Sequence, residues 1–262
     1  MSTGTSTPSV LDCAELCLFT YELPGETALQ VAAPLRSANS TSVALVPTVS
    51  VVTSNPGAWR DGGLSPGFSL AAPTGWMLTE SSSLGGFFGA AFRRQDGCLV
   101  VVLNGTDDLR DILIDDFRIL QQQIPPQLSY ALNFYQRVSS CNAGGAYVAG
   151  HSLGGALAIG VSLWFNSACV TFNSPGMASE YSDVVPNPRI PLSRAYEAQV
   201  RSRRILAFRT PYDPVSSVSF TGQQIGQVQT LDTTSRIRDR HRMQTCLDAV
   251  KARSDLHLPL SL

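Results

Sequence analysis

The stretch Tyr147-Val148-Ala149-Gly150-His151-Ser152-Leu153-Gly154-Gly155-Ala156 decides how the rest of this chain is interpreted. It begins as a short apolar strand and ends in the first turn of a small-residue helix that we expect over 153–165. Between them lies the pattern G-x-S-x-G, which places a serine on a strained strand-to-helix turn. The turn exposes the hydroxyl, and the helix N-terminus favours a developing oxyanion nearby. Because the strand and the helix that the motif requires are both predicted, we interpret Ser152 as a nucleophile rather than as part of a glycine-rich loop.

The composition is that of a globular chain with a well-filled core. Of the 262 residues, 44% are hydrophobic and 15% are charged, and the net charge is −1. This length favours one large α/β domain, which we place at residues 10–262 behind a flexible polar N-terminus at residues 1–9. The near-neutral charge gives no indication of a nucleic acid partner.

Neither an export signal nor a membrane-spanning helix is expected. The first nine residues lack the basic start and the apolar core of a secretory signal, and no apolar run is long enough to cross a bilayer. We therefore expect a soluble protein that is cytoplasmic or exported by a route without a cleavable signal peptide. The six cysteines are scattered singly, so we expect no disulfide framework, no metal site and no cofactor, with Cys98 and Cys169 as buried thiols.

Alternating strands and helices predict a mostly parallel sheet with helices on both faces. Asp96-Gly97 predicts a hairpin, and Pro125-Pro126 is expected to end a helix. The segment 55–83, rich in Gly, Pro and Ser, is expected to form an irregular cover near the site. The expected strands are 43–52 (at an edge, because of Pro47), 86–92, 98–103, 146–149, 168–172, 205–209 and 225–231, and the expected helices are 10–21, 107–123, 128–138, 153–165, 193–201 and 242–252.

A serine nucleophile needs a base, and the chain contains three histidines. His151 adjoins Ser152 and should point away from its hydroxyl, as a packed or hydrogen-bonded neighbour. His257 lies in a C-terminal tail with little to hold it. His241 follows a strand and a loop and precedes a helix, a position from which an imidazole can reach the carboxyl edge of the sheet. We predict His241 as the base; the alternative is a surface histidine in an arginine-rich loop.

The acid is expected at the end of a strand between the serine and the histidine. Asp213 follows the predicted strand 205–209 in a proline-bracketed turn, which can hold its carboxylate rigidly. We predict Asp213 as the acid. Asp232 and Asp239 are the alternatives, and both have the sequence context of ordinary turn or surface acids.

An oxyanion hole requires two preorganised N–H donors. The backbone N–H of Leu153, directly after the nucleophile, is one candidate. Thr106 is the other, because it follows an apolar strand and opens a predicted helix, so its N–H would lie at a helix N-terminus. Thr106 is also suited to act as a plain helix cap, and the two roles are compatible.

Five segments carry a family resemblance: VVLNGTDDLRD at 101–111, VAGHSLGGALA at 148–158, FNSPG at 172–176, FRTPYDPV at 208–215 and HRMQTCL at 241–247. Together they resemble the class 3 lipase family, the fungal-lipase-like branch of the α/β-hydrolases, over residues 85–250. The resemblance implies an α/β-hydrolase fold, carboxylester hydrolysis on lipids, and a movable lid helix after Thr106, which by position would be 107–117.

These observations predict a metal-free serine esterase or lipase, with phospholipase A activity as a variant. Four arginines beside His241 could attract phosphate headgroups, but a solvated arginine face partly paired with Asp232 and Asp239 is the favoured interpretation. These arginines are Arg236, Arg238, Arg240 and Arg242.

Two other classes of function stay open: an acyltransferase or thioesterase using the same triad, and a non-catalytic binding module with a hydrolase fold. The expected partners are a lipid or small ester substrate and, transiently, a membrane surface, with no nucleic acid.

Overall fold

The computed structural model describes residues 6–23, 49–50, 69–70, 72–84, 86–104, 117–142, 144–176, 203–217 and 224–260, with side chains in the helix that starts at 117 described from Gln127 onward. Within these residues, a seven-stranded sheet has the order β3-β4-β5-β6-β7-β8-β9. Two short strands, β1 (Val49–Ser50) and β2 (Ser69–Leu70), form a separate antiparallel pair.

The first three strands of the large sheet are antiparallel, and the strands from β5 onward are parallel. Gly97 has φ 90° in the turn between β4 and β5, as the Asp-Gly hairpin signal predicted. The bounds are β3 Trp76–Leu84, β4 Phe87–Arg94, β5 Leu99–Asn104, β6 Tyr147–His151, β7 Cys169–Phe172, β8 Ile205–Arg209 and β9 Gln227–Thr230.

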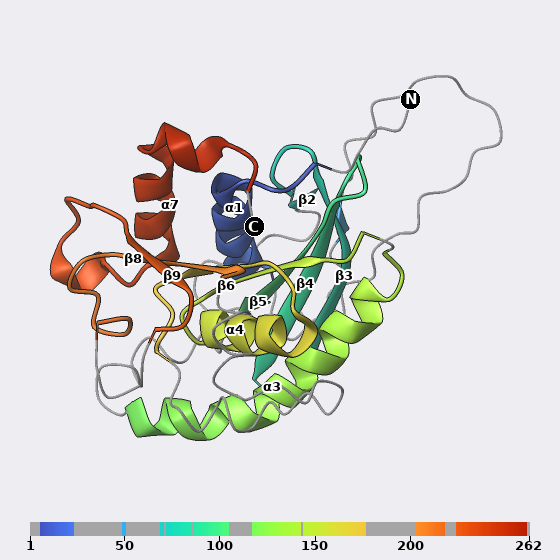
Figure 1. Ribbon diagram of the computed structural model, residues 1–262, viewed down its shortest axis with the longest axis horizontal. Coiled ribbons are helices and arrows are strands. Elements are labelled where there is room, and N and C mark those ends of the chain that lie inside the picture. Colours follow the sequence, from blue (N-terminus) through green and yellow to red (C-terminus); the bar gives the residue numbers. More distant parts are fainter. Residues whose placement is uncertain are drawn as a thin grey trace.

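Helices cover both faces of the sheet (Figure 1). α1 (Val10–Glu22) and α7 (Met243–Lys251) pack on one face, and α3 (Phe117–Ser139) and α4 (Leu153–Phe165) pack on the other. Side chains of β5 alternate between the two cores, because successive residues of a strand point to opposite faces: Val100 and Val102 join the first core, and Val101 and Leu103 the second. The predicted fold class, an α/β-hydrolase fold with a mostly parallel sheet, is confirmed.

The predicted irregular cover is wrong for its last residues. β3 begins at Trp76 and pairs with β4 at the edge of the sheet. Trp76 is buried, and its indole N–H donates to the carboxylate of Asp12 at 2.9 Å. The polar run of Thr79, Glu80 and three serines concealed a strand in which Thr79–Ser82 are half-buried.

Pro125-Pro126 does not end a helix, contrary to prediction. α3 runs from Phe117 to Ser139, and Figure 1 shows it changing direction along its length rather than stopping. A proline removes one backbone hydrogen bond and tends to kink a helix. Beyond the prolines, Leu128 packs over Gly160 of α4, where a Cβ atom would lie 2.6 Å from the Leu128 side chain. Tertiary packing of this part of α3 thus outweighs the local preference of the prolines.

The N-terminal segment contacts the rest of the domain from Ser6 onward. Ser6 donates to the carboxylate of Asp96, and Thr7 donates to the carbonyl oxygen of Leu260. Ser9 caps α1 in a capping box with Asp12. These contacts place both ends of the described chain beside α1.

The C-terminal tail makes more contacts than predicted. Residues Ser254–His257 form the 3-10 helix η3, and His257 Nε2 donates to the carbonyl oxygen of Val250 at 3.2 Å. All six cysteines are free thiols; Cys98 and Cys169 are buried, as expected. Across the described segments, no helix is both long enough and apolar enough to cross a membrane.

Several predictions lie outside the described residues. They are the oxyanion role of Thr106, the helix expected from 107 to 116 with the lid helix implied there, most of the strand over 43–52, and the helix over 193–201.

Candidate active site

Ser152 lies on the turn between β6 and α4, at the carboxyl edge of the sheet. Its backbone has φ 57° and ψ −130°, a conformation that is rare for a residue with a side chain. The Ser152 N–H donates to the carbonyl oxygen of Phe172 on β7 at 3.0 Å, which anchors the turn to the neighbouring strand. The strained strand-to-helix turn predicted from the motif is present.

Glycine is required in this turn because backbones approach closely. A Cβ atom on Gly154 would lie 1.9 Å from the carbonyl oxygen of Leu103, and one on Gly150 would lie 2.3 Å from the carbonyl oxygen of Gly154. Any side chain at either position would push α4 away from β5 or distort the turn. The two glycines thus bring the first turn of α4 against the ends of β5 and β6, and the position of Ser152 follows from that contact.

The side chains of His241 and Ser152 are in contact, although the two residues are 89 positions apart in the sequence. His241 lies in the turn between the 3-10 helix η2 (Ile237–Asp239) and α7, and its Nε2 is 2.8 Å from Ser152 Oγ. Its Nδ1 is 2.9 Å from Oδ1 of Asp213. A carboxylate only accepts, so Nδ1 donates to Asp213, and in the neutral ring Nε2 accepts from the serine hydroxyl.

Asp213 is fully buried in the loop after β8. Besides the bond from His241, it accepts the backbone N–H of Ser216 at 2.7 Å through Oδ2. Burial raises the pKa of a carboxyl group, but hydrogen bonding and the charge of His241, together with the hydrogen bond from Ser216, hold the pKa of Asp213 below its usual value. The carboxylate is therefore ionised at neutral pH and oriented towards His241.

The alternative acids and bases bind other groups or lie at the surface. Asp239 pairs with Arg242 at 3.1 Å and with Arg238 at 3.7 Å, and Asp232 is exposed at the surface. His151 makes hydrogen bonds with Tyr21 and with the backbone carbonyl of His241, so it is a hydrogen-bonded neighbour, as predicted. The described residues thus bring Ser152, His241 and Asp213 together.

Of the two predicted oxyanion donors, one falls within the described residues. Leu153 is the first residue of α4, a position whose N–H has no acceptor within its own helix. Thr106 lies outside the described residues. No group of three or more His, Cys, Asp or Glu side chains in the described ranges is arranged to hold a metal ion.

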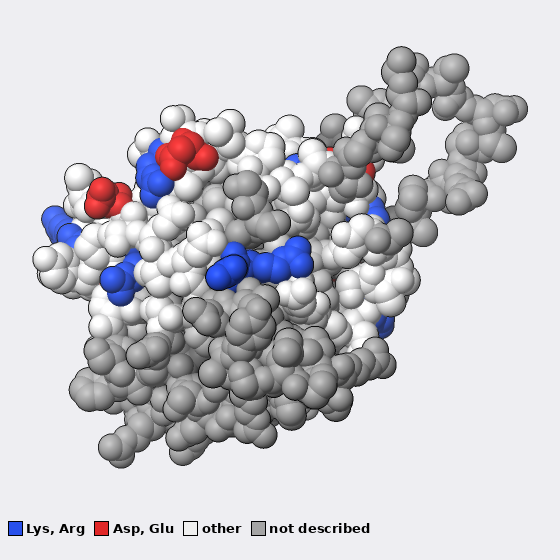
Figure 2. All heavy atoms as spheres, viewed as in Figure 1, with Lys and Arg blue, Asp and Glu red and all other residues white. Residues whose placement is uncertain are grey.

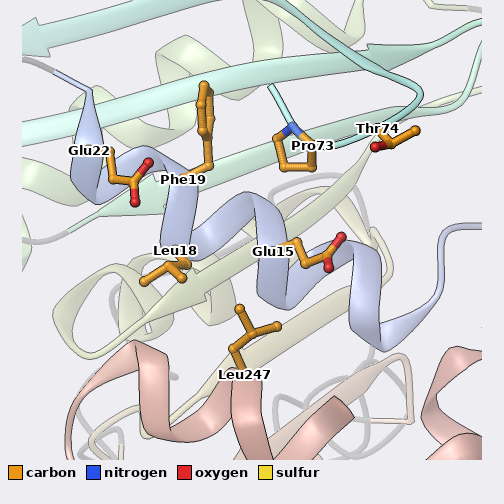
Figure 3. A pocket seen from close by; sticks show the side chains of 7 residues that line it. All are labelled: Glu15, Leu18, Phe19, Glu22, Pro73, Thr74 and Leu247. Atoms are coloured by element: carbon orange, nitrogen blue, oxygen red, sulfur yellow. The ribbon is translucent and has the colours of Figure 1, made fainter. Parts of the chain in front are cut away.

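A separate open hollow of about 290 Å³ lies between α1, the middle of α7 and the turn before β3. Figure 3 shows Leu18 and Leu247 facing each other in it, with Glu15 and Glu22 projecting from α1. Neither Ser152 nor its two partners line this hollow, so it is not part of the candidate active site.

A model of the phospholipase-like group, described as the Tle-like phospholipase domain, matches residues 53–253, which is well over half of the chain. The chain belongs to the Tle-like phospholipase family. This membership confirms the lipase-like family suggested by the five sequence segments, and it supports the class of lipid ester hydrolases.

Structures similar to this Tle-like phospholipase domain include the native propeptide complex of Rhizomucor miehei lipase, at 13% identity and a TM-score of 0.40, covering 72% of this chain and 71% of that chain. A deletion mutant of the same complex is similar at 14% identity and a TM-score of 0.38, covering 72% of this chain and 69% of that one. The comparison with curated protein sequences gave no match.

Sequence reasoning missed Asn173, which ties three segments of the Tle-like phospholipase domain together. Its N–H donates to the carbonyl oxygen of Phe208, its Oδ1 accepts the N–H of Thr210, and its Nδ2 donates to the carbonyl oxygen of Arg240 at 2.7 Å. These bonds join the ends of β7 and β8 to the loop that carries His241. The available signal was the segment FNSPG, whose asparagine follows a buried strand in a turn context.

Proposed function

We propose that this protein is a serine carboxylester hydrolase that cleaves acyl esters of lipids through an acyl-enzyme intermediate. The observation that carries the proposal is the hydrogen-bonded series from the buried carboxylate of Asp213 through His241 to the hydroxyl of Ser152. A serine hydroxyl becomes a useful nucleophile when a base adjoins it and the base is itself oriented by an acid.

In the first half of the reaction, Ser152 Oγ attacks the ester carbonyl carbon and His241 Nε2 takes the hydroxyl proton. The imidazolium that forms lies 2.9 Å from the Asp213 carboxylate, whose negative charge stabilises it. The tetrahedral intermediate then collapses, the ester C–O bond breaks, and His241 returns the proton to the leaving alcohol. The acyl group remains esterified to Ser152.

The developing oxyanion would be bound by the backbone N–H groups of Leu153 and Thr106. Support for Leu153 is its place at the N-terminus of α4, where the N–H is free of intrahelical bonding and the helix dipole is positive. The oxyanion role of Thr106 is supported by the sequence pattern alone. In the second half, His241 takes a proton from water as the water oxygen attacks the acyl carbonyl carbon. The bond from that carbon to Ser152 Oγ then breaks, His241 returns the proton to Oγ, and the fatty acid leaves.

The substrate class is narrowed by the family. Because the matching domain is described as phospholipase-like, we favour phospholipids cleaved at an acyl ester, the phospholipase A reaction, over a triacylglycerol substrate.

The test is fatty acid release from phosphatidylcholine and from short and long p-nitrophenyl esters, with the unaltered protein beside Ser152→Ala. We expect release that disappears in the variant, and labelling of Ser152 by a fluorophosphonate. Absence of both hydrolysis and labelling would contradict the proposal and favour a non-catalytic binding module.

An acyltransferase would pass through the same acyl-enzyme but give a different product. If Ser152 is labelled yet acyl groups from phospholipid appear on an added alcohol or thiol rather than as free fatty acid, the acceptor is not water and the hydrolase assignment is wrong.

A further inference from the structure

Two large apolar side chains stand exposed on the loops that carry the proposed acid and base. Tyr212, directly before Asp213, is 74% exposed, and Ile237 in η2, four residues before His241, is 63% exposed. Tyr212 has φ 57°, a left-handed conformation that a bulky residue rarely adopts. The guanidinium of Arg240 lies over its ring, 5.3 Å from the centroid, and donates to the carbonyl oxygen of Pro211 at 2.7 Å. Tyr212 is thus held at the surface by the loop that carries the base.

Arg236 and Arg238 flank Ile237 in the sequence, and Arg240 lies over Tyr212. The segment 232–242 contains four arginines and two aspartates, a net charge of +2 in a chain whose total is −1. The side chains of Arg238 and Arg242 are 74% and 56% exposed, and both pair with the carboxylate of Asp239. One carboxylate balances the charge of only one of these two guanidinium groups. Arg236 is exposed as well, whereas Arg240 is engaged with the Pro211 loop. In Figure 2, basic side chains lie over the left end of the molecule, where Figure 1 shows β8, β9 and the following loop.

Exposed apolar side chains beside arginines suit one kind of partner. Exposed apolar side chains favour an apolar medium, an exposed tyrosine suits a boundary between apolar and wet regions, and clustered arginines favour phosphate groups. An anionic lipid surface offers all three at once. The surface is also continuous with the candidate active site, because Asn173 and Thr210 donate to the carbonyl oxygen of Arg240 at the end of this loop.

We propose that Tyr212, Ile237, Arg236 and Arg238 form a docking surface for anionic phospholipid bilayers, which we call the arginine-loop surface. The proposal deepens the proposed function, on which it rests for its biological purpose: the loops that carry Asp213 and His241 would lie against the bilayer that contains the ester. Ile237 enters the interface, and the arginines contact headgroup phosphates.

The test is sedimentation of the full chain carrying Ser152→Ala, which prevents lipid breakdown, with vesicles of phosphatidylcholine alone or mixed with phosphatidylglycerol. We expect stronger binding to the mixed vesicles, weakened by added salt. Each arginine near an anionic surface strengthens binding about fivefold, so Arg236→Gln with Arg238→Gln should weaken binding to the mixed vesicles by ~10-fold or more. Ile237→Ser should weaken binding to both kinds of vesicle.

The matched control is Arg137→Gln with Arg203→Gln. Both arginines are exposed, both changes together remove the same charge, and both positions precede parallel strands, at the sheet edge opposite the candidate active site. The double variant Arg236→Gln with Arg238→Gln is called the arginine-loop pair. The proposal is overturned if the control pair weakens vesicle binding as much as the arginine-loop pair does. It is also overturned if phosphatidylglycerol does not strengthen binding of the unaltered loop. Binding to polyglutamate that the arginine-loop pair abolishes, with no binding to either vesicle, would assign the surface to an acidic protein instead.

Hydrolysis and docking are tested separately. Because binding is measured on Ser152→Ala protein, docking can succeed in a chain that proves to be no hydrolase, and it can fail in an active one. In the Ser152 background, the arginine-loop pair should hydrolyse a short soluble ester at the unaltered rate and release fatty acid from mixed vesicles more slowly. Loss of both activities would indicate damage to the loop, contrary to a docking role.

Discussion

The backbone carbonyl oxygen of His241 lies 2.6 Å from Nε2 of His151, the residue directly before the proposed nucleophile. A carbonyl only accepts, so Nε2 carries the proton and donates. Nδ1 of the neutral ring then accepts from the hydroxyl of Tyr21 on α1 at 2.8 Å. His151 thus links α1, the turn of Ser152 and the loop of His241, and it positions the base through its backbone rather than through its ring.

His151→Phe keeps a ring but removes the donor to His241. We expect kcat for a short ester to fall about 10-fold to 100-fold, because small misplacements of a catalytic group are costly, with KM nearly unchanged. Tyr21→Phe, which leaves the donor in place, should have a smaller effect. A rise in KM with kcat intact would indicate a role in substrate binding and contradict the positioning role.

The conformation of Ser152 predicts a gain in stability when the side chain is removed completely. Its φ and ψ are those of a position that favours glycine, and strain of this kind costs about 1–3 kcal/mol. Against this gain, a glycine lowers the free energy of unfolding by about 0.4–1 kcal/mol relative to alanine, because it gives the unfolded chain more conformational entropy. We expect Ser152→Gly to exceed Ser152→Ala by about 1 kcal/mol in the free energy of unfolding by urea. Both variants lack the hydroxyl, so equal stabilities would show that the turn is not strained.

Gly154→Ala should be strongly destabilising although alanine is the better helix former. The added Cβ would meet the Leu103 carbonyl oxygen at 1.9 Å, so α4 must move, and we expect a loss of about 3 kcal/mol in unfolding free energy. Gly144→Ala is the control, because the nearest atom to its Cβ lies at 4.0 Å. A Gly154→Ala protein as stable as the control would contradict the close packing of α4 on β5.

The lowered pKa of Asp213 predicts how stability depends on pH. Because its pKa is lower in the folded than in the unfolded protein, the ionised carboxylate stabilises the fold at pH values above the usual aspartate pKa. That contribution is lost as the pH falls through the folded pKa. Relative to Asp213→Asn, the unaltered protein should be more stable at pH 7 by about 1.5–3 kcal/mol, the range for hydrogen bonds to charged groups. The difference should shrink below pH ~4 in urea unfolding. A constant difference would show that the pKa is unshifted.

The local sequence pattern was sufficient to predict much of the fold. The strand and helix around Ser152, the hairpin between β4 and β5, and the strand before Asp213 appear close to their predicted bounds, because their apolar periodicity and turn residues agree with their tertiary surroundings. The misses occurred where local preference and packing disagree. β3 is rich in serine yet completes an edge of the sheet, and α3 continues through two prolines because Leu128 packs over Gly160.

The sequence by itself determined that Ser152 sits on a strand-to-helix turn, because that turn is built from adjacent residues and requires glycine at fixed offsets. It also limited the base and the acid to a few candidates by residue type. Tertiary structure alone decided that Asn173 joins the three loops and that His151 supports the base, since these bonds join residues distant in sequence. Hydrogen bonds of this kind depend on distances between loop ends at one sheet edge, and no periodicity along the chain encodes those distances.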